Sequence, residues 1–279
     1  MSGDLEDTLS SIVTEEGVVH YEVDGRGKPV LLLHGWINSW DVWRETMLTL
    51  SDSRRYKIYA LDFWGFGESI KQKTPPFKIS SYVQMVDQFM EIMGIARAPV
   101  IGHSMGGTVA LSLTLDHPAR VEQVAVVGSP INGMSLNIWL ILSGNPTLAW
   151  LVWRIPIILR FVVWMVLAGD TPEVRRMIER DLSRTAMEPF FRSIESLRKT
   201  DLRPRLGEIR VPTLGIFGRH DNIVNPSQAQ VLARGVRVAQ VRMMEHSRHF
   251  PMLDEPELFY ETLLGFLDRA KPGPRGGFR

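Results

Sequence analysis

The sequence predicts an α/β protein whose core is a mostly parallel, twisted sheet with helices on both faces. Two features of the chain carry this prediction. Short apolar runs without polar alternation recur along it, which is typical of strands that are covered on both faces. Segments whose apolar residues have helical spacing separate these runs, and such an alternation favours parallel pairing. The length of 279 residues and the apolar content of 44% fit one large folded domain with an insertion.

The first two strands are expected on either side of a glycine-rich turn. Asp24 to Gly27 gives a hairpin-type signal between two apolar runs, and the second run, Val30 to Leu33, suits a strand buried on both faces. Further strands are expected at 57–62, 100–101, 121–129, 213–218 and 238–244. Helices are expected at 81–94, 105–117 and 256–270.

Residues 131–200 break the alternation of strands and helices. They contain almost only helix-forming and apolar residues, without a plausible central strand. We therefore expect a helical cap, or lid, at 131–200, inserted into a core made of 1–130 and 201–279. The later part of this cap, 172–199, alternates charges and is expected to form ordinary solvated helices.

The composition excludes several classes of function. The formal net charge of +1 provides no basic excess, so no nucleic-acid partner is expected. The absence of cysteine excludes disulfides, thiol catalysis and Cys-ligated metals, and we expect neither a cofactor nor a metal. The polar start MSGDLEDTLSS lacks the basic and apolar regions of a secretory signal, so a cytoplasmic protein is expected.

The segment APVIGHSMGGTVA, residues 98–110, holds the strongest chemical signal. Residues 102–106 read Gly-His-Ser-Met-Gly, a G-x-S-x-G motif that follows an apolar strand and precedes a helical pattern. A serine at such a sharp turn has its hydroxyl lifted clear of the sheet. The helix N-terminus behind it favours developing negative charge. We therefore predict that Ser104 is a nucleophile.

A serine hydroxyl needs a base, and the base needs an orienting acid. After a strand–turn–helix nucleophile, the partners are expected in the order acid, then histidine, on loops that follow later strands. The loop after the expected strand 213–218 offers Asp221. The loop after the expected strand 238–244 offers both His246 and His249, and chain order alone leaves these two open.

With these residues in place, the chain resembles the α/β-hydrolase superfamily, in its lid-bearing branch of serine esterases and lipases. Phe-Pro-Met-Leu after His249 matches the family's His-aromatic-Pro stretch before the last helix, so the resemblance favours His249 over His246. This chain has Arg248 where the family usually has glycine, a departure that bears on the entrance to the site. Residues 218–221 fit the family's Gly-x-x-Asp pattern. The family's other position for the acid, the loop 128–135, contains no Asp or Glu.

Acyl transfer builds negative charge on the carbonyl oxygen, and two backbone N–H groups normally receive it. One donor is expected from Met105, the residue after the nucleophile. Residues 34–36 read His-Gly-Trp and resemble the family's oxyanion turn. The resemblance makes Trp36 the second donor and His34 a structural support of that turn.

A fourth motif is LDFWGFGES, residues 61–69, which matches the family's Asp-x-x-Gly-x-Gly-x-Ser loop. The resemblance implies that Asp62 and Ser69 hold this loop together. It spans nearly the whole chain outside 131–200 and rests on four motifs in the same order. The serine at position 104 argues against two other activities of this fold, because dehalogenases and epoxide hydrolases use aspartate as the nucleophile at that place.

The resemblance implies a cofactor-free serine hydrolase that cleaves carboxylic esters with hydrophobic acyl or alcohol groups through an acyl-serine. Carboxylesterase or monoglyceride-lipase-like activity is the leading expectation. Serine-dependent carbon–carbon bond hydrolases, lactonases and perhydrolases share the scaffold and stay open as alternatives. A binding protein without enzymatic activity is a further alternative, and the intact Ser104, Asp221 and His249 argue against it.

Residues 148–169, LAWLVWRIPIILRFVVWMVLAG, carry only two charges and three tryptophans. A membrane span here would put the nucleophile on one side of the bilayer and its acid and base on the other, which their required contact forbids. Because Pro146 and Pro156 suit helix starts, we expect two short lid helices, 146–154 and 156–168. Their apolar surface is expected to line a hydrophobic pocket, to touch a membrane or lipid, or to form a dimer contact.

Overall fold

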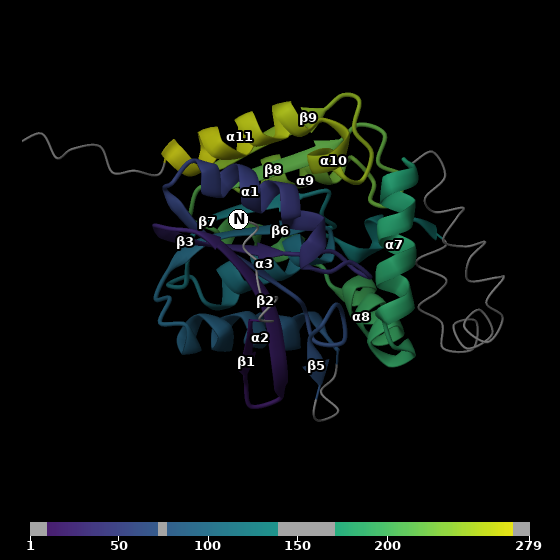
Figure 1. The fold of residues 1–279 in the computed structure, drawn as a ribbon. Helices are drawn as coiled ribbons and strands as arrows, with labels where there is room; N and C mark the ends of the chain where they lie inside the picture. Colours follow the sequence, from purple (N-terminus) through teal and green to yellow (C-terminus); the bar gives the residue numbers. More distant parts are fainter. Residues whose placement is uncertain (1–9, 72–76, 139–170, 270–279) are drawn as a thin grey trace, which may run out of the picture.

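The computed structural model describes residues 10–71, 77–138 and 171–269, which form an α/β unit around one sheet (Figure 1). The strands are β1 (Ser11–Val13), β2 (Gly17–Gly25), β3 (Lys28–Leu33), β4 (Tyr56–Leu61), β5 (Ile70–Lys71), β6 (Ala98–His103), β7 (Val121–Val127), β8 (Thr213–Gly218) and β9 (Ala239–Met244). The α-helices are α1 (Arg44–Asp52), α2 (Ile79–Ile92), α3 (Met105–Asp116), α7 (Pro172–Arg184), α8 (Met187–Lys199), α9 (Gln228–Gly235), α10 (Pro251–Asp254) and α11 (Pro256–Arg269). Every strand and helix expected within these ranges is present, with small differences at the ends.

The strands follow one another across the sheet in the order β1-β2-β4-β3-β6-β7-β8-β9, and β5 pairs with β2. Neighbours from β4 to β9 are parallel, whereas β2 is antiparallel to β1, β4 and β5. The predicted mostly parallel sheet is therefore confirmed.

The predicted hairpin between the first two runs is wrong. Gly25 and Gly27 do turn the chain, with φ angles of 77° and 123°, but β2 and β3 are not neighbours. Instead β4 lies between them and pairs with both. All but one of the side chains of β4 are buried, as suits an inner strand of the sheet.

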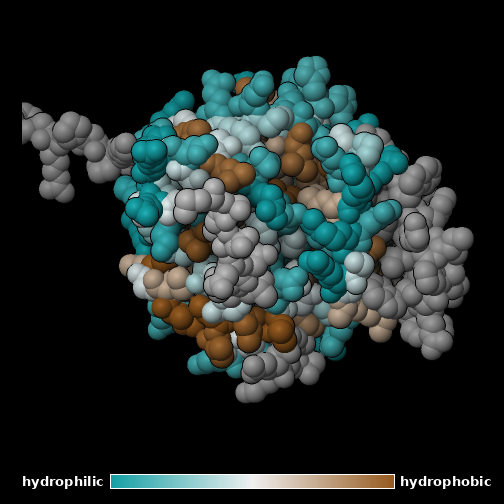
Figure 2. Space-filling view, viewed as in Figure 1, coloured by the Kyte–Doolittle hydropathy of each residue, from teal (hydrophilic) through white to brown (hydrophobic). Residues whose placement is uncertain are grey.

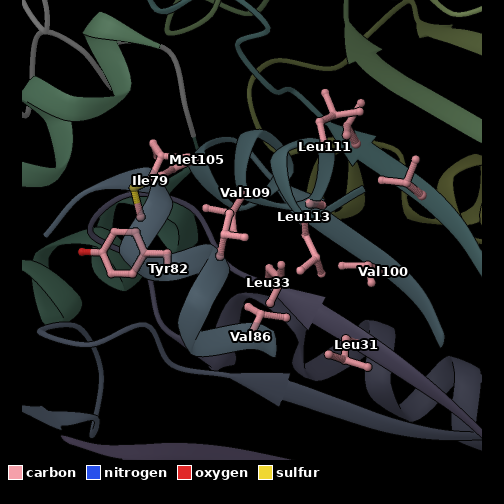
Figure 3. Close-up of a cluster of buried hydrophobic side chains, with 14 of the residues drawn as sticks. Leu31, Leu33, Ile79, Tyr82, Val86, Val100, Met105, Val109, Leu111 and Leu113 are labelled. Carbon is pink, nitrogen blue, oxygen red and sulfur yellow. The ribbon is translucent and has the colours of Figure 1, made fainter. Parts of the chain in front are cut away.

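The central strands send alternate side chains into two hydrophobic layers, one on each face of the sheet. Leu31 and Leu33 of β3 enter one layer with α2 and α3, whereas Val30 and Leu32 enter the other with α1 and α11. Figure 3 shows part of the first layer, with Leu31, Leu33 and Val86 of α2. All these β3 side chains are fully buried, as expected for a strand without polar alternation.

Two α-helices, α7 and α8, lie in the described part of the segment between β7 and β8. The prediction that 172–199 is helical is confirmed. The hydroxyl of Thr171 caps α7 by accepting a hydrogen bond from the backbone N–H of Val174 at 3.3 Å, and Pro172 occupies the first turn. Both helices place apolar side chains against the rest of the molecule, so they are ordinary amphipathic surface helices.

The two lid helices expected at 146–154 and 156–168, and the stretch 148–169 that suggested them, lie outside the described residues. The division of the chain into a core and a cap stays a prediction. Within the ranges that the structure describes, no helix is long and apolar enough to cross a membrane.

Some hydrophobic side chains remain on the outside of the antiparallel end of the sheet. The strand register places Val13 opposite Val18, and Val18 opposite Ile70. Val13 and Ile70 are 70% and 63% exposed. On the face drawn in Figure 2, hydrophilic residues predominate and a hydrophobic patch lies toward the lower edge. The Val13–Ile70 row is several strands away from β6, so it does not shape the site described below.

Candidate active site

Ser104 lies at the sharp turn between β6 and α3. Its backbone has φ 51° and ψ −119°, a combination that residues with side chains rarely adopt. The turn is tight because the backbones approach closely at glycines. A Cβ on Gly102 would lie 2.2 Å from the main-chain oxygen of Gly106, and a Cβ on Gly106 would lie 2.3 Å from that of Leu33. Backbone contact therefore requires the G-x-S-x-G pattern, which places Ser104 at the N-terminus of α3.

Asp221 and His249 form a buried acid–base pair on the loops that follow β8 and β9. His249 Nδ1 lies 2.8 Å from Asp221 Oδ2. The other carboxylate oxygen, Oδ1, accepts hydrogen bonds from the backbone N–H groups of Ile223 at 2.8 Å and Val224 at 2.9 Å. The side chain of the rival histidine, His246, is exposed. Of the two histidines left open by chain order, the structure brings His249 to the acid.

The turn that carries Ser104 and the pair of Asp221 and His249 lie at the same end of the sheet. The backbone N–H of Ser104 donates to the oxygen of Val127, 2.8 Å away. The next residue, Gly128, lies beside the pair, since a Cβ there would be 3.3 Å from His249 Nδ1 and 3.5 Å from Asp221 Oδ2. Ser104 Oγ makes no hydrogen bond within the described part of the chain, which leaves the hydroxyl open to a partner.

Two backbone donors face no acceptor near the elbow. Neither the N–H of Trp36 nor that of Met105 is hydrogen-bonded to a backbone or side-chain acceptor in residues 10–71, 77–138 and 171–269. His34 supports the Trp36 turn as predicted, because its Nδ1 donates to the oxygen of Gly35 at 2.7 Å and its Nε2 accepts from the N–H of Phe63 at 2.9 Å. Burial lowers the pKa of His34, and this ring is neutral.

The chain is similar to known proteins in both sequence and structure. Residues 28–155 match the family described as alpha/beta hydrolase fold. The pimeloyl-[acyl-carrier protein] methyl ester esterase of Vibrio cholerae serotype O1 is 26% identical over 90% of this chain and 98% of its own length. The 2-hydroxy-6-oxononadienedioate/2-hydroxy-6-oxononatrienedioate hydrolase of Escherichia coli O81 is 26% identical over 90% of this chain and 91% of its own.

The solved structure of a membrane phospholipase A superposes with a TM-score of 0.78 at 26% identity, covering 95% of this chain and 87% of that chain. The chain has the α/β-hydrolase fold. At the level of reaction class, the comparisons support a hydrolase.

The α/β hydrolase also has a histidine in its elbow that the sequence reasoning did not assign. His103 Nε2 lies 2.9 Å from the main-chain oxygen of His249, and the two rings lie 4.7 Å apart. The ring of His103 also packs against Phe250 at 4.8 Å and lies edge-on to Trp43 at 6.4 Å. Burial, and then the neighbouring His249, lower the pKa of His103 well below its usual range. The sequence does hold one signal for His103, which is its position directly before the proposed nucleophile.

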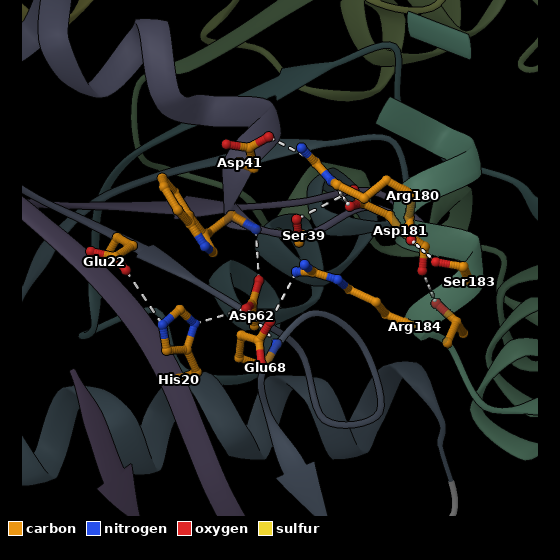
Figure 4. A network of polar contacts seen from close by, with 12 residues as sticks. His20, Glu22, Ser39, Asp41, Asp62, Glu68, Arg180, Asp181, Ser183 and Arg184 are labelled. Atoms are coloured by element: carbon orange, nitrogen blue, oxygen red, sulfur yellow. Dashed lines mark hydrogen bonds and ion pairs between the residues drawn. The ribbon is translucent and has the colours of Figure 1, made fainter. Parts of the chain in front are cut away.

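The loop 62–69 is held as the resemblance implied. Asp62, which is fully buried, accepts hydrogen bonds from the backbone N–H groups of Trp40 at 2.6 Å and Glu68 at 3.0 Å, and His20 Nδ1 lies 2.8 Å away (Figure 4). Ser69 Oγ donates to the main-chain oxygen of Asp62 at 2.7 Å. In this hydrolase, Asp62 therefore ties the loop to the segment that follows the oxyanion turn.

Helix α7 is tied to the same region by charges. Arg180 lies between Asp41, at 2.7 Å, and Asp181, at 2.9 Å, and Ser39 Oγ donates to Asp181 at 3.3 Å (Figure 4). Burial raises the pKa of Asp181, although Arg180 acts to lower it. The sequence reasoning missed the contacts that Asp41 and Ser39 make with α7, which join residues about 140 positions apart in the chain.

Arg248, which stands where the family usually has glycine, donates its backbone N–H to Asp254 Oδ2 at 2.8 Å. This bond holds the start of the segment that carries His249. In the described ranges, no group of three or more His, Asp or Glu side chains is placed to hold a metal ion.

Proposed function

We propose that this α/β hydrolase cleaves carboxylic esters with hydrophobic acyl or alcohol groups by serine catalysis. The observation that carries the proposal is the contact of 2.8 Å between His249 Nδ1 and Asp221 Oδ2, at the same end of the sheet as the strained Ser104 turn. A buried carboxylate on Nδ1 holds the ring proton there and leaves Nε2 free to accept the proton of a serine hydroxyl. That arrangement suits nucleophilic attack on an acyl carbon.

In the proposed reaction, Ser104 Oγ attacks the ester carbonyl carbon while His249 Nε2 takes the hydroxyl proton. The carbonyl π electrons move to oxygen, where the N–H groups of Trp36 and Met105 donate hydrogen bonds. As the bond to the alcohol oxygen breaks, His249 returns the proton to that oxygen and acyl-Ser104 remains. Water then attacks the acyl carbon with His249 as base, and collapse releases the acid and restores the Ser104 hydroxyl.

The substrate class rests on two further observations. The stretch 148–169 is strongly apolar in sequence, as expected of a cap that meets hydrophobic groups. The relative from Vibrio cholerae is named for a methyl ester, and a structural neighbour is a phospholipase A. Both support a carboxylesterase or a monoglyceride-lipase-like enzyme.

Carbon–carbon bond hydrolysis is a second candidate reaction on the same scaffold. The Escherichia coli relative is named for 2-hydroxy-6-oxo dienedioate and trienedioate substrates, and it covers as much of this chain as the esterase does. Lactone hydrolysis and perhydrolysis use the same nucleophile, acid and base. Because the site geometry is common to these reactions, substrates rather than structure separate them.

A substrate panel tests the proposal. We expect turnover of p-nitrophenyl esters across a range of acyl lengths, with weaker or no turnover of a vinylogous diketone and a lactone. Ser104→Ala should lower ester turnover by about 10³-fold or more. Ser112→Ala is the matched control, because Ser112 lies on α3 and is 7% exposed against 5% for Ser104. A wild-type protein that cleaves no ester, or Ser104→Ala with wild-type rates, contradicts the proposal.

A peripheral contact of the cap with lipid is a separate proposal that rests on the sequence of 148–169. Flotation with liposomes tests it. Substitution of Trp150, Trp153 or Trp164 by Asp should weaken flotation, since each change places a charge in an apolar surface. Absence of flotation by the wild type contradicts lipid contact and leaves the esterase proposal intact.

A further inference from the structure

Trp36 joins the oxyanion turn to helix α8. Its indole Nε1–H donates to the main-chain oxygen of Phe190 at 2.9 Å, and the two rings stack with centroids 4.4 Å apart and planes tilted by 45°. Phe190 is 3% exposed. The residue whose backbone N–H is the proposed oxyanion donor is thus bound by its own side chain to a helix from the segment between β7 and β8.

Helix α8 is itself fixed against the core, so the Phe190 oxygen has a defined position. The hydroxyl of Ser196 accepts a hydrogen bond from the backbone N–H of Ile79 at 3.0 Å. At the other end, the helix packs closely on the loop 62–69, because a Cβ on Gly65 would lie 2.5 Å from the Cβ of Pro189. A shift of α8 relative to the sheet would therefore pull on the indole of Trp36.

The oxyanion turn needs such a tether. Ile37, which follows Trp36, has a φ of 71°, a left-handed value that is strained for a β-branched residue. A strained backbone persists only where its surroundings hold it. On the core side the turn is held by the hydrogen bonds of His34, and on the other side by the indole of Trp36 and by the bond from Ser39 to Asp181.

We propose that α8 positions the backbone N–H of Trp36 for oxyanion stabilisation, acting through the Trp36 side chain and Phe190. This inference rests on the proposed function, because it assigns a positioning role within the same site. The segment between β7 and β8 then contributes to the chemical step itself, rather than only covering it. Trp36 is positioned by a hydrogen bond and by ring stacking, and the two can be removed separately.

Two substitutions separate these contacts. Trp36→Phe removes the Nε1–H and keeps an aromatic ring, whereas Phe190→Leu removes the ring stack and keeps the main-chain oxygen. Trp40→Phe is the matched control, because the ring of Trp40 stacks on the exposed Arg44 and its indole N–H makes no hydrogen bond within the described residues. Phe190→Tyr keeps the stack and serves as the conservative rescue.

The readouts are kcat, KM and the inhibition constant of a trifluoromethyl ketone, whose adduct with serine carries an oxyanion. A displaced donor weakens transition-state binding and leaves substrate binding alone. We expect each of Trp36→Phe and Phe190→Leu to lower kcat by about 10-fold and to raise the inhibition constant of the ketone by a similar factor. The KM of each variant should change by less than about 2-fold. Phe190→Tyr and Trp40→Phe should stay near wild type.

The double variant should lose about as much as the worse single variant, since the two side chains act as one unit. Unchanged kcat and ketone affinity in both single variants, with normal thermal unfolding, overturns the inference. A change in KM alone overturns it as well, because that pattern reports a binding surface. If Trp36→Phe fails to fold, the comparison of Phe190→Leu with Phe190→Tyr decides. Ester turnover by the wild type is measured in the same series, so failure of the proposed function is seen separately.

Discussion

His103 Nε2 lies 2.9 Å from the main-chain oxygen of His249, and the imidazole rings of the two residues lie 4.7 Å apart. Because a carbonyl oxygen can only accept, Nε2 of His103 carries the proton, and burial lowers the pKa of this ring well below its usual range. A neutral histidine directly before the proposed nucleophile thus supports the backbone of the proposed base.

His103→Gln and His103→Leu form the first test. A Gln amide can place an N–H near the position of Nε2, whereas Leu leaves the buried oxygen of His249 without a donor. We expect His103→Leu to be less stable than His103→Gln by about 1–3 kcal/mol, and to have the lower kcat. Chemical unfolding and ester turnover measure the two effects. Equal stability and activity of the two variants would show that the bond to His249 has no role.

The Asp221→Asn variant tests the orientation of the base. Asp221 Oδ1 accepts two backbone N–H groups, so the oxygen of the introduced amide would stay on that side and its NH₂ group would face His249. An N–H opposite Nδ1 forces the ring proton to Nε2, which can then no longer accept the serine proton. We expect kcat to fall by about 10³–10⁴-fold with the fold intact.

Asp116→Asn provides the control for this change, since Asp116 pairs with Arg205 on the surface and lies outside the site. Steady-state kinetics and circular dichroism are the measurements. Retention of most activity by Asp221→Asn would contradict the role of the acid.

The backbone strain at Ser104 predicts that the residue needed for activity lowers the stability of the protein. Ser104→Gly and Ser104→Ala both remove the hydroxyl, and only glycine relieves the backbone strain at φ 51° and ψ −119°. We expect the free energy of unfolding of Ser104→Gly to exceed that of Ser104→Ala by about 1 kcal/mol. Denaturant unfolding of the two inactive variants checks this, and a less stable Ser104→Gly would argue against strain.

The buried contact between His20 and Asp62 predicts a dependence of stability on pH. Burial acts to lower the pKa of His20, but the hydrogen bond and charge of Asp62, with Glu22, outweigh it and raise the pKa above 6.5. The folded state then binds the proton more tightly than the unfolded state does. This contribution is full below the pKa of the unfolded chain and is lost as the pH rises through the higher folded value.

His20→Asn keeps an N–H toward Asp62 and cannot titrate. We expect the free energy of unfolding of the wild type, relative to His20→Asn, to decrease between about pH 6 and about pH 9. Urea unfolding across this range measures it. A difference that stays constant, or that grows with pH, would contradict a raised pKa for His20.

The proposed catalytic residues could be placed from the sequence because chain order and strand ends determine where they meet. Ser104, Asp221 and His249 each follow a strand of the parallel region, and the carboxyl ends of parallel strands share one edge of the sheet. Chain order left two histidines open in one loop, and the resemblance favoured His249 through the Phe-Pro-Met-Leu that follows it. The structure adds the physical reason, because His249 is buried beside the acid and His246 is exposed.

The contacts that support the site could not be predicted in the same way. The indole of Trp36 and the oxygen of Phe190 are 154 positions apart, and their meeting depends on where α8 packs. The hairpin failed for a related reason, because the turn at Gly25 and Gly27 was recognised but the strand that inserts beside β2 comes later in the chain. Local patterns predict elements, whereas strand order follows from which strands must be buried.

The central claim is that Ser104 is a nucleophile activated by His249. Treatment with a fluorophosphonate probe, followed by mass spectrometry of the labelled peptides, tests it most directly. The account predicts a single adduct on Ser104 in the wild type, none in Ser104→Ala, and labelling of His249→Gln slower by about 10³-fold or more. A wild-type protein that is not labelled, or an adduct on another residue, would contradict it.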